Sequence, residues 1–357
     1  MVIKSIIKLL PLKSAMMLAA VALLFSACEG LVYDKEGDCV VNYRLRFVYN
    51  KNLKWADAFP SEVHSVHLYA FDSNGLFVKE FMANGEEVDS EDYRMLIDLT
   101  PGKYTLVAWC GMENEGVAEK SFTVPVPVAG QTRLEELTCA LNVKSDSESA
   151  AYSDTMLRFL YHGMMELDLP NVYNGDFDYT MYLTKDTNHI RVILQQLSGE
   201  DMDSNDFDFR IEDANGLLGY DNDPLGTELI SYRPWDILSD EAGIIPNDGT
   251  EMRSDMVYAK GVIADLSTNR LLADHQDDFI LTITGKGKKI AQLPIMQYSL
   301  MSKEYYEMAY GHNMTEQDFL DRQDEYIYTI ILDDALRWLE VHINILSWRV
   351  VVRNYEI

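Results

Sequence analysis

The chain has 357 residues, of which 47% are hydrophobic and 11% aromatic, so it can bury full hydrophobic cores and is not a disordered chain. Lys and Arg number 30 against 58 Asp and Glu, and the net charge of −28 disfavours a nucleic-acid-binding protein, because phosphates repel an acidic surface. Four cysteines are too few for a disulfide-stabilised scaffold, and this length predicts about two domains.

The amino terminus has the features of an export signal. Residues 1–27 contain lysines and no acidic residue, and the apolar stretch Ala15–Phe25 precedes Ser26-Ala27-Cys28. Because this stretch is shorter than the roughly 20 residues that span a bilayer, we predict a lipoprotein signal peptide at residues 1–27 and no membrane helix. A cysteine after two small residues matches the bacterial lipobox, which predicts lipidation of Cys28. The alternative is an ordinary signal peptide, with Cys28 as an incidental thiol.

Residues 28–38 are predicted to form an acidic tether between the lipid and the folded part. An acidic surface is repelled by anionic headgroups, so we expect the lipid rather than a basic patch to hold the chain on the outer membrane. More than one acyl chain makes such an anchor stable.

Residues 39–146 are predicted to form an N-terminal β-sandwich domain. Apolar side chains alternate with polar ones, which is the period of a half-buried strand. Proline cannot donate to a sheet ladder and therefore favours an edge. The elements predicted here lie at residues 39–50 and 63–71 (strands), 72–75 (a turn), 94–109 (a hairpin around Pro101-Gly102) and 120–128 (an edge strand with Pro125 and Pro127).

The polar run 144–149 is predicted to be a linker, and residues 147–357 a C-terminal β-sandwich domain. The fold class is therefore all-β, with two antiparallel sandwiches in tandem and one short helix near the C-terminus. Thr315 is a candidate N-cap for this helix, at residues 315–322. Strand patterns lie at residues 178–197, 207–213, 277–295, 326–332 and 341–357, the last with a bulge or tight turn between Ile345 and Leu346.

One acidic cluster has the spacing of a calcium loop. Asp201, Asp203 and Asn205 alternate, and Glu212 follows eleven residues after Asp201, as do the oxygen ligands of an EF-hand. Position six is Asp206 instead of glycine, and residues 207–213 alternate like a strand, which separates Glu212 from the cluster. We therefore expect no metal site and retain calcium binding only as the alternative.

Chemistry-bearing motifs are scarce elsewhere. Cys39, Cys110 and Cys139 have no CxxC spacing, which leaves buried thiols or one disulfide as alternatives. No phosphate loop, GxSxG elbow or HExxH helix is present in the sequence, so we predict a protein that is not an enzyme and needs no cofactor. Asp154-Thr155-Met156 fits a short O-glycosylation pattern, with an unmodified linker threonine at Thr155 as the alternative.

An ordered series of motifs resembles the FimB-type fimbrial anchor lipoproteins of the Bacteroides–Porphyromonas group. The motifs cover almost the whole mature chain: LRFVYNKN, VHSVHLYAFDSNG, LTPGKYTLVAWCG, LTKDTNHIRVILQQLSG, FRIEDANG, YRPW, LDRQDEYIYTIILD and INILSW. The resemblance implies two transthyretin-like domains and a lipoprotein at the base of a surface fimbria, where relatives anchor the filament and limit its length. Its implied partners are fimbrial subunits and the outer membrane.

Filament subunits of this kind add a strand to a neighbour's sheet. Here the amino terminus is expected to be held by lipid, and the chain stops with its last predicted strand, which indicates an anchor or terminator. The alternative is a tip adhesin or a glycan-binding surface lipoprotein, in which exposed Trp55, Trp235 and Trp348 stack on sugars. Core filling is the competing role, and we favour it for Trp109 and Trp348.

Overall fold

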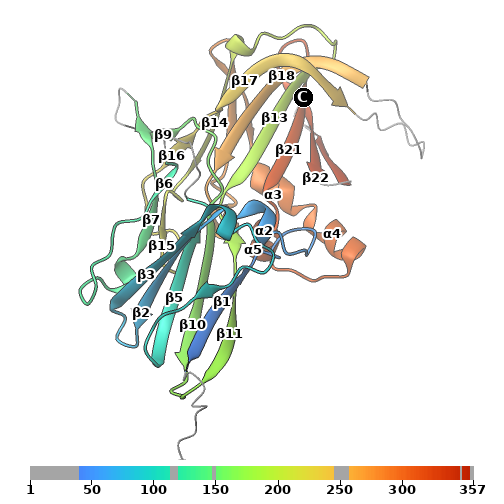
Figure 1. Ribbon diagram of the computed structural model, residues 1–357. Helices are drawn as coiled ribbons and strands as arrows, with labels where there is room; N and C mark the ends of the chain where they lie inside the picture. The colour runs from blue at the N-terminus through green and yellow to red at the C-terminus, as the bar shows by residue number, and fades with distance from the viewer. Residues whose placement is uncertain (1–39, 113–119, 147–149, 245–256, 346–347, 354–357) are drawn as a thin grey trace, which may run out of the picture. The chain divides into compact units, whose positions relative to one another are not determined.

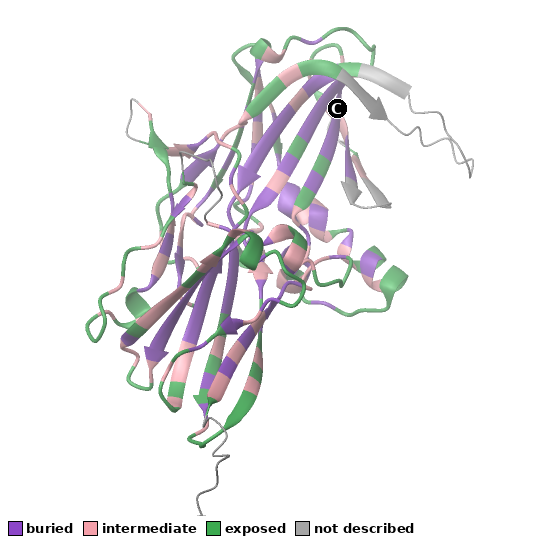
Figure 2. Cartoon of the chain, viewed as in Figure 1, coloured by how far each residue is buried: buried purple, intermediate pink, exposed green. Residues whose placement is uncertain are grey.

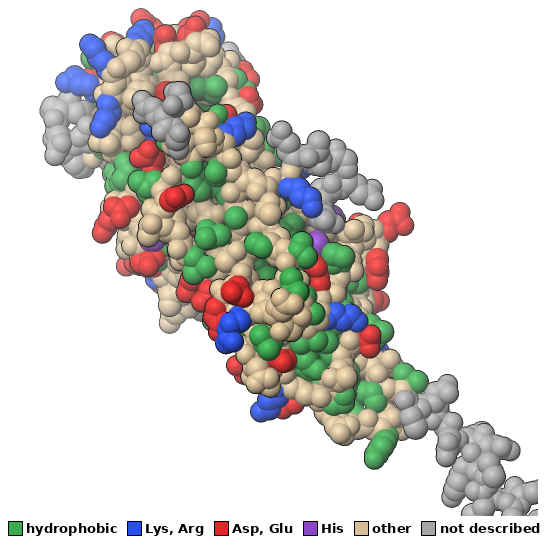
Figure 3. Space-filling model, turned by 90° about the vertical axis from the view of Figure 1, so that its left-hand side faces the viewer, with side chains coloured by type: hydrophobic (Ala, Val, Ile, Leu, Met, Phe, Trp, Pro, Cys, Tyr) green, Lys and Arg blue, Asp and Glu red, His purple; other side chains and the backbone are tan. Residues whose placement is uncertain are grey.

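The computed structural model describes residues 40–112, 120–146, 150–244, 257–345 and 348–353. Strands predominate in this part of the chain, which confirms the all-β fold class (Figure 1). Most strand pairs are antiparallel, but β13 with β21 and β9 with β16 are parallel. Acidic and basic side chains are interspersed on the face shown in Figure 3.

Two sheets contain the first strands of the chain. One has the order β11–β1–β4 and the other the order β12–β10–β5–β2–β3. The alternation predicted for β1 is present, and β2 is buried at every residue except its last, so both of its faces are covered (Figure 2). The strand bounds are β1 (Val41–Val48), β2 (Ser65–Asp72), β3 (Phe77–Asn84), β4 (Met95–Leu96), β5 (Gly102–Cys110), β10 (Tyr161–Leu169), β11 (Gly175–Tyr182) and β12 (Thr184–Lys185).

The hairpin predicted at residues 94–109 is wrong. β4 pairs with β1, whereas β5 pairs with β2 and β10, so the chain changes sheets between them. Gly102, with φ 155°, begins β5 directly after Pro101. Alternation shows that each strand is half-buried, but it does not specify the partner strand.

Three more sheets are built mainly from later residues, in the orders β17–β18–β13–β21–β22–β23, β20–β19–β14–β16–β9–β8 and β15–β7–β6. Of the edge strand predicted at residues 120–128, only Phe122–Thr123 is strand, as β6, which does lie at the edge of its sheet. Pro125 and Pro127 follow it outside any strand. The bounds are β6 (Phe122–Thr123), β7 (Thr138–Leu141), β8 (Lys144–Ser145), β9 (Ala151–Ser153), β13 (Asn188–Gln196), β14 (Phe207–Asp213), β15 (Leu217–Gly219), β16 (Ile230–Tyr232), β17 (Asp236–Ile244), β18 (Val257–Thr268), β19 (Leu281–Gly285), β20 (Lys288–Leu293), β21 (Glu325–Leu332), β22 (Trp338–Ile345) and β23 (Trp348–Arg353).

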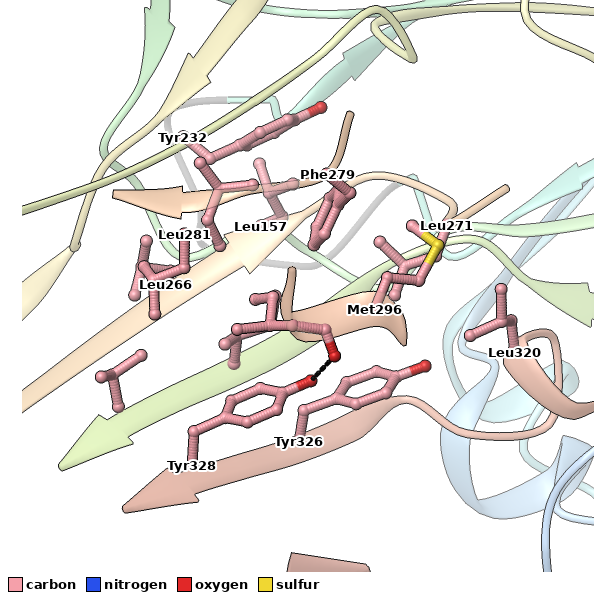
Figure 4. Packing of buried hydrophobic residues seen from close by; sticks show 14 of the residues in the cluster. Leu157, Tyr232, Leu266, Leu271, Phe279, Leu281, Met296, Leu320, Tyr326 and Tyr328 are labelled. Atoms are coloured by element: carbon pink, nitrogen blue, oxygen red, sulfur yellow. Dashed lines mark hydrogen bonds between the residues drawn. The ribbon is translucent and has the colours of Figure 1, made fainter. Parts of the chain in front are cut away.

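Aromatic and aliphatic side chains fill the space beside β21. Tyr326 and Tyr328 are buried there with Phe279 (Figure 4). The Tyr328 hydroxyl donates to the Ile295 carbonyl at 3.1 Å. A buried phenol loses water, so this hydrogen bond offsets a desolvation cost. Burial of each large apolar side chain contributes roughly 1.5–3 kcal/mol, which makes this cluster a main source of stability.

The helix predicted near the C-terminus is confirmed. It is α5 (Glu316–Leu320), and the Thr315 hydroxyl accepts from the Asp318 amide at 3.0 Å. Three further helices within the described residues were not predicted. The first two are α2 (Phe59–Glu62) and α3 (Ile295–Leu300), and the third, α4 (Lys303–Tyr310), ends at Gly311 in the left-handed conformation (φ 71°). Short turns of 3₁₀ helix cover Gly85–Glu87, Leu134–Glu136, Ser204–Asp206 and Ala273–His275.

The run predicted as a linker is partly strand, because β8 pairs with β9 at the edge of a sheet. β10 pairs with β5 over nine residue pairs, so residues beyond this run contribute to a sheet of earlier strands. The division between residues 146 and 147 stays a prediction.

Asp186 is a fully buried carboxyl whose Oδ1 accepts from Asn222 Nδ2 at 2.7 Å. Burial raises its pKa from 3.8 to about 7, and Arg270 and Asn222 oppose this shift. Because the pKa is higher in the folded state, this group stabilises the fold most below pH 3.8. We expect this stabilisation to be lost as the pH rises toward 7, at about 1.4 kcal/mol per pH unit.

Asp186→Asn should remove this pH dependence. Relative to the wild type, its free energy of unfolding should rise by about 2–3 kcal/mol between pH 5 and pH 7, as measured by urea denaturation. Asp98→Asn is the matched control, because Asp98 is exposed. Parallel pH profiles for Asp186→Asn and wild type would contradict the expectation.

Candidate functional site

The predicted signal peptide (1–27), the tether (28–38) and the lipidation site Cys28 lie outside the described residues, so these features stay predictions. The described chain begins at Val40. None of the helices in the described ranges is long and apolar enough to cross a membrane.

The cysteine thiols that the structure describes are free. Cys110 and Cys139 are both fully buried and unpaired, and burial raises the pKa of each thiol. These two residues therefore form no disulfide with each other, and a high thiol pKa makes them unreactive. Cys39 lies outside the described part of the chain.

The acidic cluster forms a capped turn. The Asp203 carboxylate caps the short turn by accepting from the Asn205 backbone at 3.0 Å, a hydrogen bond that lowers its pKa. Asp201 pairs with Lys260 at 2.9 Å, and Glu212 lies on β14, 3.8 Å from Arg210. No group of three or more His, Cys, Asp or Glu side chains in the described ranges is placed to hold a metal ion.

Thr155 lies at a surface cleft of about 420 Å³ beside β9. The rim includes Lys144, which pairs with Asp154 at 2.7 Å, and Tyr152, whose ring lies 4.2 Å from the Arg233 guanidinium. Thr155 is half-buried, so its hydroxyl is at the surface rather than in a core. Its O-glycosylation stays a prediction.

The tryptophans differ in their environments. Trp109 is fully buried, which confirms its predicted core role, whereas the side chain of Trp348 is outside the described part. Trp235 is half-buried and stacks on His189 with ring centroids 5.7 Å apart. Trp55 is 37% exposed.

Contacts from distant residues hold Trp55 in place. The Arg322 guanidinium lies 3.6 Å from its ring, His312 stacks on it at 4.1 Å, and its indole N–H donates to the Tyr306 hydroxyl at 3.1 Å. Its φ of 56° is left-handed, which is unfavourable for a side chain of this size and is held by these contacts. An indole already stacked on one face is a poorer platform for a sugar than the sequence suggested.

The sheet edges are the features best suited to strand addition. In the six-stranded sheet that contains β21, the outer strands are β17 and β23. β17 pairs with β18 over nine residue pairs, and β23 pairs with β22 over six, from Ile345↔Trp348 to Glu340↔Arg353. Among the described strands of this sheet, each of these two has a neighbouring strand on one side only, which is the geometry that strand addition uses. Sequence reasoning missed β17 because it has no strong alternation of apolar and polar residues.

Comparisons with known proteins agree with this architecture. The family model described as fimbrillin-A associated anchor proteins Mfa1 and Mfa2 matches residues 35–354. The minor fimbrium anchoring subunit Mfa2 of Porphyromonas gingivalis is 20% identical over 293 residues, which cover 78% of this chain and 78% of that protein.

Two solved structures are also similar. A provisionally assigned adhesin of Bacteroides thetaiotaomicron is 32% identical, with a TM-score of 0.70, covering 86% of this chain and 96% of that one. The structure of the fimbrial anchor protein Mfa2 from Porphyromonas gingivalis has a TM-score of 0.60 at 16% identity, covering 88% and 99%, and shows a shared fold.

Proposed function

Because the chain belongs to the family of fimbrillin-A associated anchor proteins, we propose that it anchors a fimbria to the outer membrane through lipidated Cys28 and limits the filament's length. The match over residues 35–354 carries this proposal and confirms the family resemblance drawn from the motifs. The family is one of fimbrial structural proteins rather than enzymes, and it implies a location in a fimbrium at the cell surface.

A strand-type contact with the adjoining fimbrial subunit is the proposed mode of attachment. Backbone hydrogen bonds along an edge strand supply affinity, and side-chain pockets supply specificity. β23 is already paired with β22 inside its own sheet. Because β23 takes part in its own sheet, this strand is not available for donation to a neighbouring subunit, and this supports the proposed role as a terminator.

Immunogold labelling tests the anchoring role. Antibody against this chain should label the cell-proximal end of each fimbria, and cells that lack the chain should shed longer filaments into the medium. Electron microscopy measures both the label position and the filament length. Label at the base of the fimbriae together with an unchanged filament length would support the anchoring role and contradict the length-limiting role.

A tip adhesin is the second candidate, since the chain is 32% identical to the provisionally assigned adhesin. This role predicts gold particles at the free ends of filaments and loss of host-surface binding without loss of filament attachment. The same micrographs separate the two candidates.

A further inference from the structure

The turn between β10 and β11 is uncharged and exposes apolar side chains. Its residues 170–175 read Pro-Asn-Val-Tyr-Asn-Gly and contain no charge, whereas the turns at residues 72–75 and 221–223 carry aspartates. Tyr173 is 89% exposed and Val172 is 39% exposed. The turn therefore offers apolar side chains to its surroundings and carries no charge of its own, and the nearest acidic side chain after it, Asp176, is bonded to Asn42.

This turn is held against the residues where the described chain begins. The Gly175 amide donates to the Val40 carbonyl at 3.2 Å, and Asn42 Nδ2 donates to Asp176 Oδ1 at 2.8 Å. Val40 is itself 50% exposed, and β1 lies beside β11 (Figure 1). The described residues among Met1–Asn42 and Val172–Asp176 belong to one compact unit. We call Val40, Val172 and Tyr173 the entry tip.

We propose that the entry tip docks on the lipid surface to which the chain is tethered. This inference rests on the proposed lipid at Cys28. Eleven residues lie between Cys28 and Val40, and an extended chain over that span reaches at most about 40 Å. Val40 is therefore the described residue nearest to the anchor along the chain, and Val172 and Tyr173 belong to the same compact unit.

The tether is what makes such a small contact effective. Once the lipid is inserted, docking of the tip is an intramolecular step with an effective concentration in the millimolar range, so a few apolar side chains can hold it. Tyrosine has an apolar ring and a polar hydroxyl, which suits the boundary between acyl chains and headgroups. An uncharged turn also avoids repulsion from anionic lipids.

An environment-sensitive fluorophore on Tyr173→Cys tests the proposal. The background is Cys39→Ser, and the buried thiols Cys110 and Cys139 are inaccessible to the label. The lipidated chain is reconstituted into phosphatidylcholine vesicles that contain spin-labelled lipid. We expect the probe at residue 173 to be quenched at least about twofold, because it enters the interface. Val126→Cys, at a position 87% exposed, is the matched control and should stay unquenched.

A second arm separates this proposal from the anchoring role. The chain from residue 29, with an N-terminal hexahistidine tag, is bound to vesicles that contain nickel-chelating lipid. Quenching at residue 173 in this arm supports tip docking even if the natural chain proves to be unlipidated. A probe at residue 173 that stays in water on vesicle-bound protein overturns tip docking but does not affect the anchoring proposal. A probe that leaves water only when a fimbrial subunit is added also overturns tip docking, because the tip then contacts protein.

Discussion

A Cys28→Ala chain is expected to lose attachment to the outer membrane almost completely. A bacterial lipoprotein cysteine carries three acyl chains, and each buried methylene contributes about 0.8 kcal/mol, so the proposed lipidation of Cys28 predicts a stable attachment. Without the thiol no acyl chain can be attached, and the acidic protein that remains is repelled by anionic headgroups. Membrane fractionation with immunoblotting should show the variant missing from the outer-membrane fraction and fimbriae shed into the medium.

The uncleaved signal peptide of this variant could itself hold the chain in the inner membrane. A second variant therefore replaces residues 1–28 with an ordinary cleavable signal, which gives a chain that begins at Glu29. Cys39→Ala is the matched control and should remain with the membrane. Retention of both altered chains in the outer membrane would show that another feature attaches the protein.

Asp321→Ala is expected to destabilise the fold by about 3–5 kcal/mol, since it leaves the half-buried cations Arg270 and Lys51 without their counter-charge. The Asp321 side chain is only 2% exposed, and its Oδ2 accepts from Lys51 at 2.8 Å. Arg270 donates to both carboxylate oxygens at 3.0 Å, and Gln317 donates to Oδ1 at 2.8 Å. Urea denaturation at pH 7 measures the loss.

The pH dependence of the same site gives an independent check. Burial alone would raise the pKa of Asp321, but the hydrogen bonds and charges of Arg270 and Lys51 outweigh burial and hold the pKa below its usual value. The carboxylate therefore stabilises the fold above pH 3.8, and this contribution is lost as the pH falls through the lowered pKa. Asp98→Ala removes an exposed ion pair with Lys79 and should change stability by less than about 1 kcal/mol. Equal losses for the two variants would contradict the role of Asp321.

Strands with a clear period of two were predictable from the sequence. β1, β2 and β14 alternate or are bounded by Asp, Asn and Gly turns, and local chemistry is enough to place them. The partners of strands were not predictable, because pairing depends on residues far apart in the chain. The sheet change between β4 and β5 shows this, since both segments flank a Pro-Gly pair that also suits a hairpin.

Side-chain environments that depend on distant residues were also beyond the sequence. The tip-adhesin alternative required Trp55 to be an open platform, yet residues more than 250 positions away stack on it and bond to it. The separation of Glu212 from the acidic cluster was easier to predict. Residues 207–213 alternate like a strand in the sequence, and they form β14 in the structure. Cys28 remains a prediction from local sequence.

The pairing of β10 with β5 affects how the chain folds during its synthesis on the ribosome. β5 carries Val107 and Trp109, and nine of its residues are matched by β10, which is about 50 residues later in the sequence. Until residues 161–169 arrive, this edge stays open and prone to aberrant pairing. We therefore expect recombinant fragments that end near residue 146 to aggregate, and expression of soluble antigen to require a terminus beyond β12.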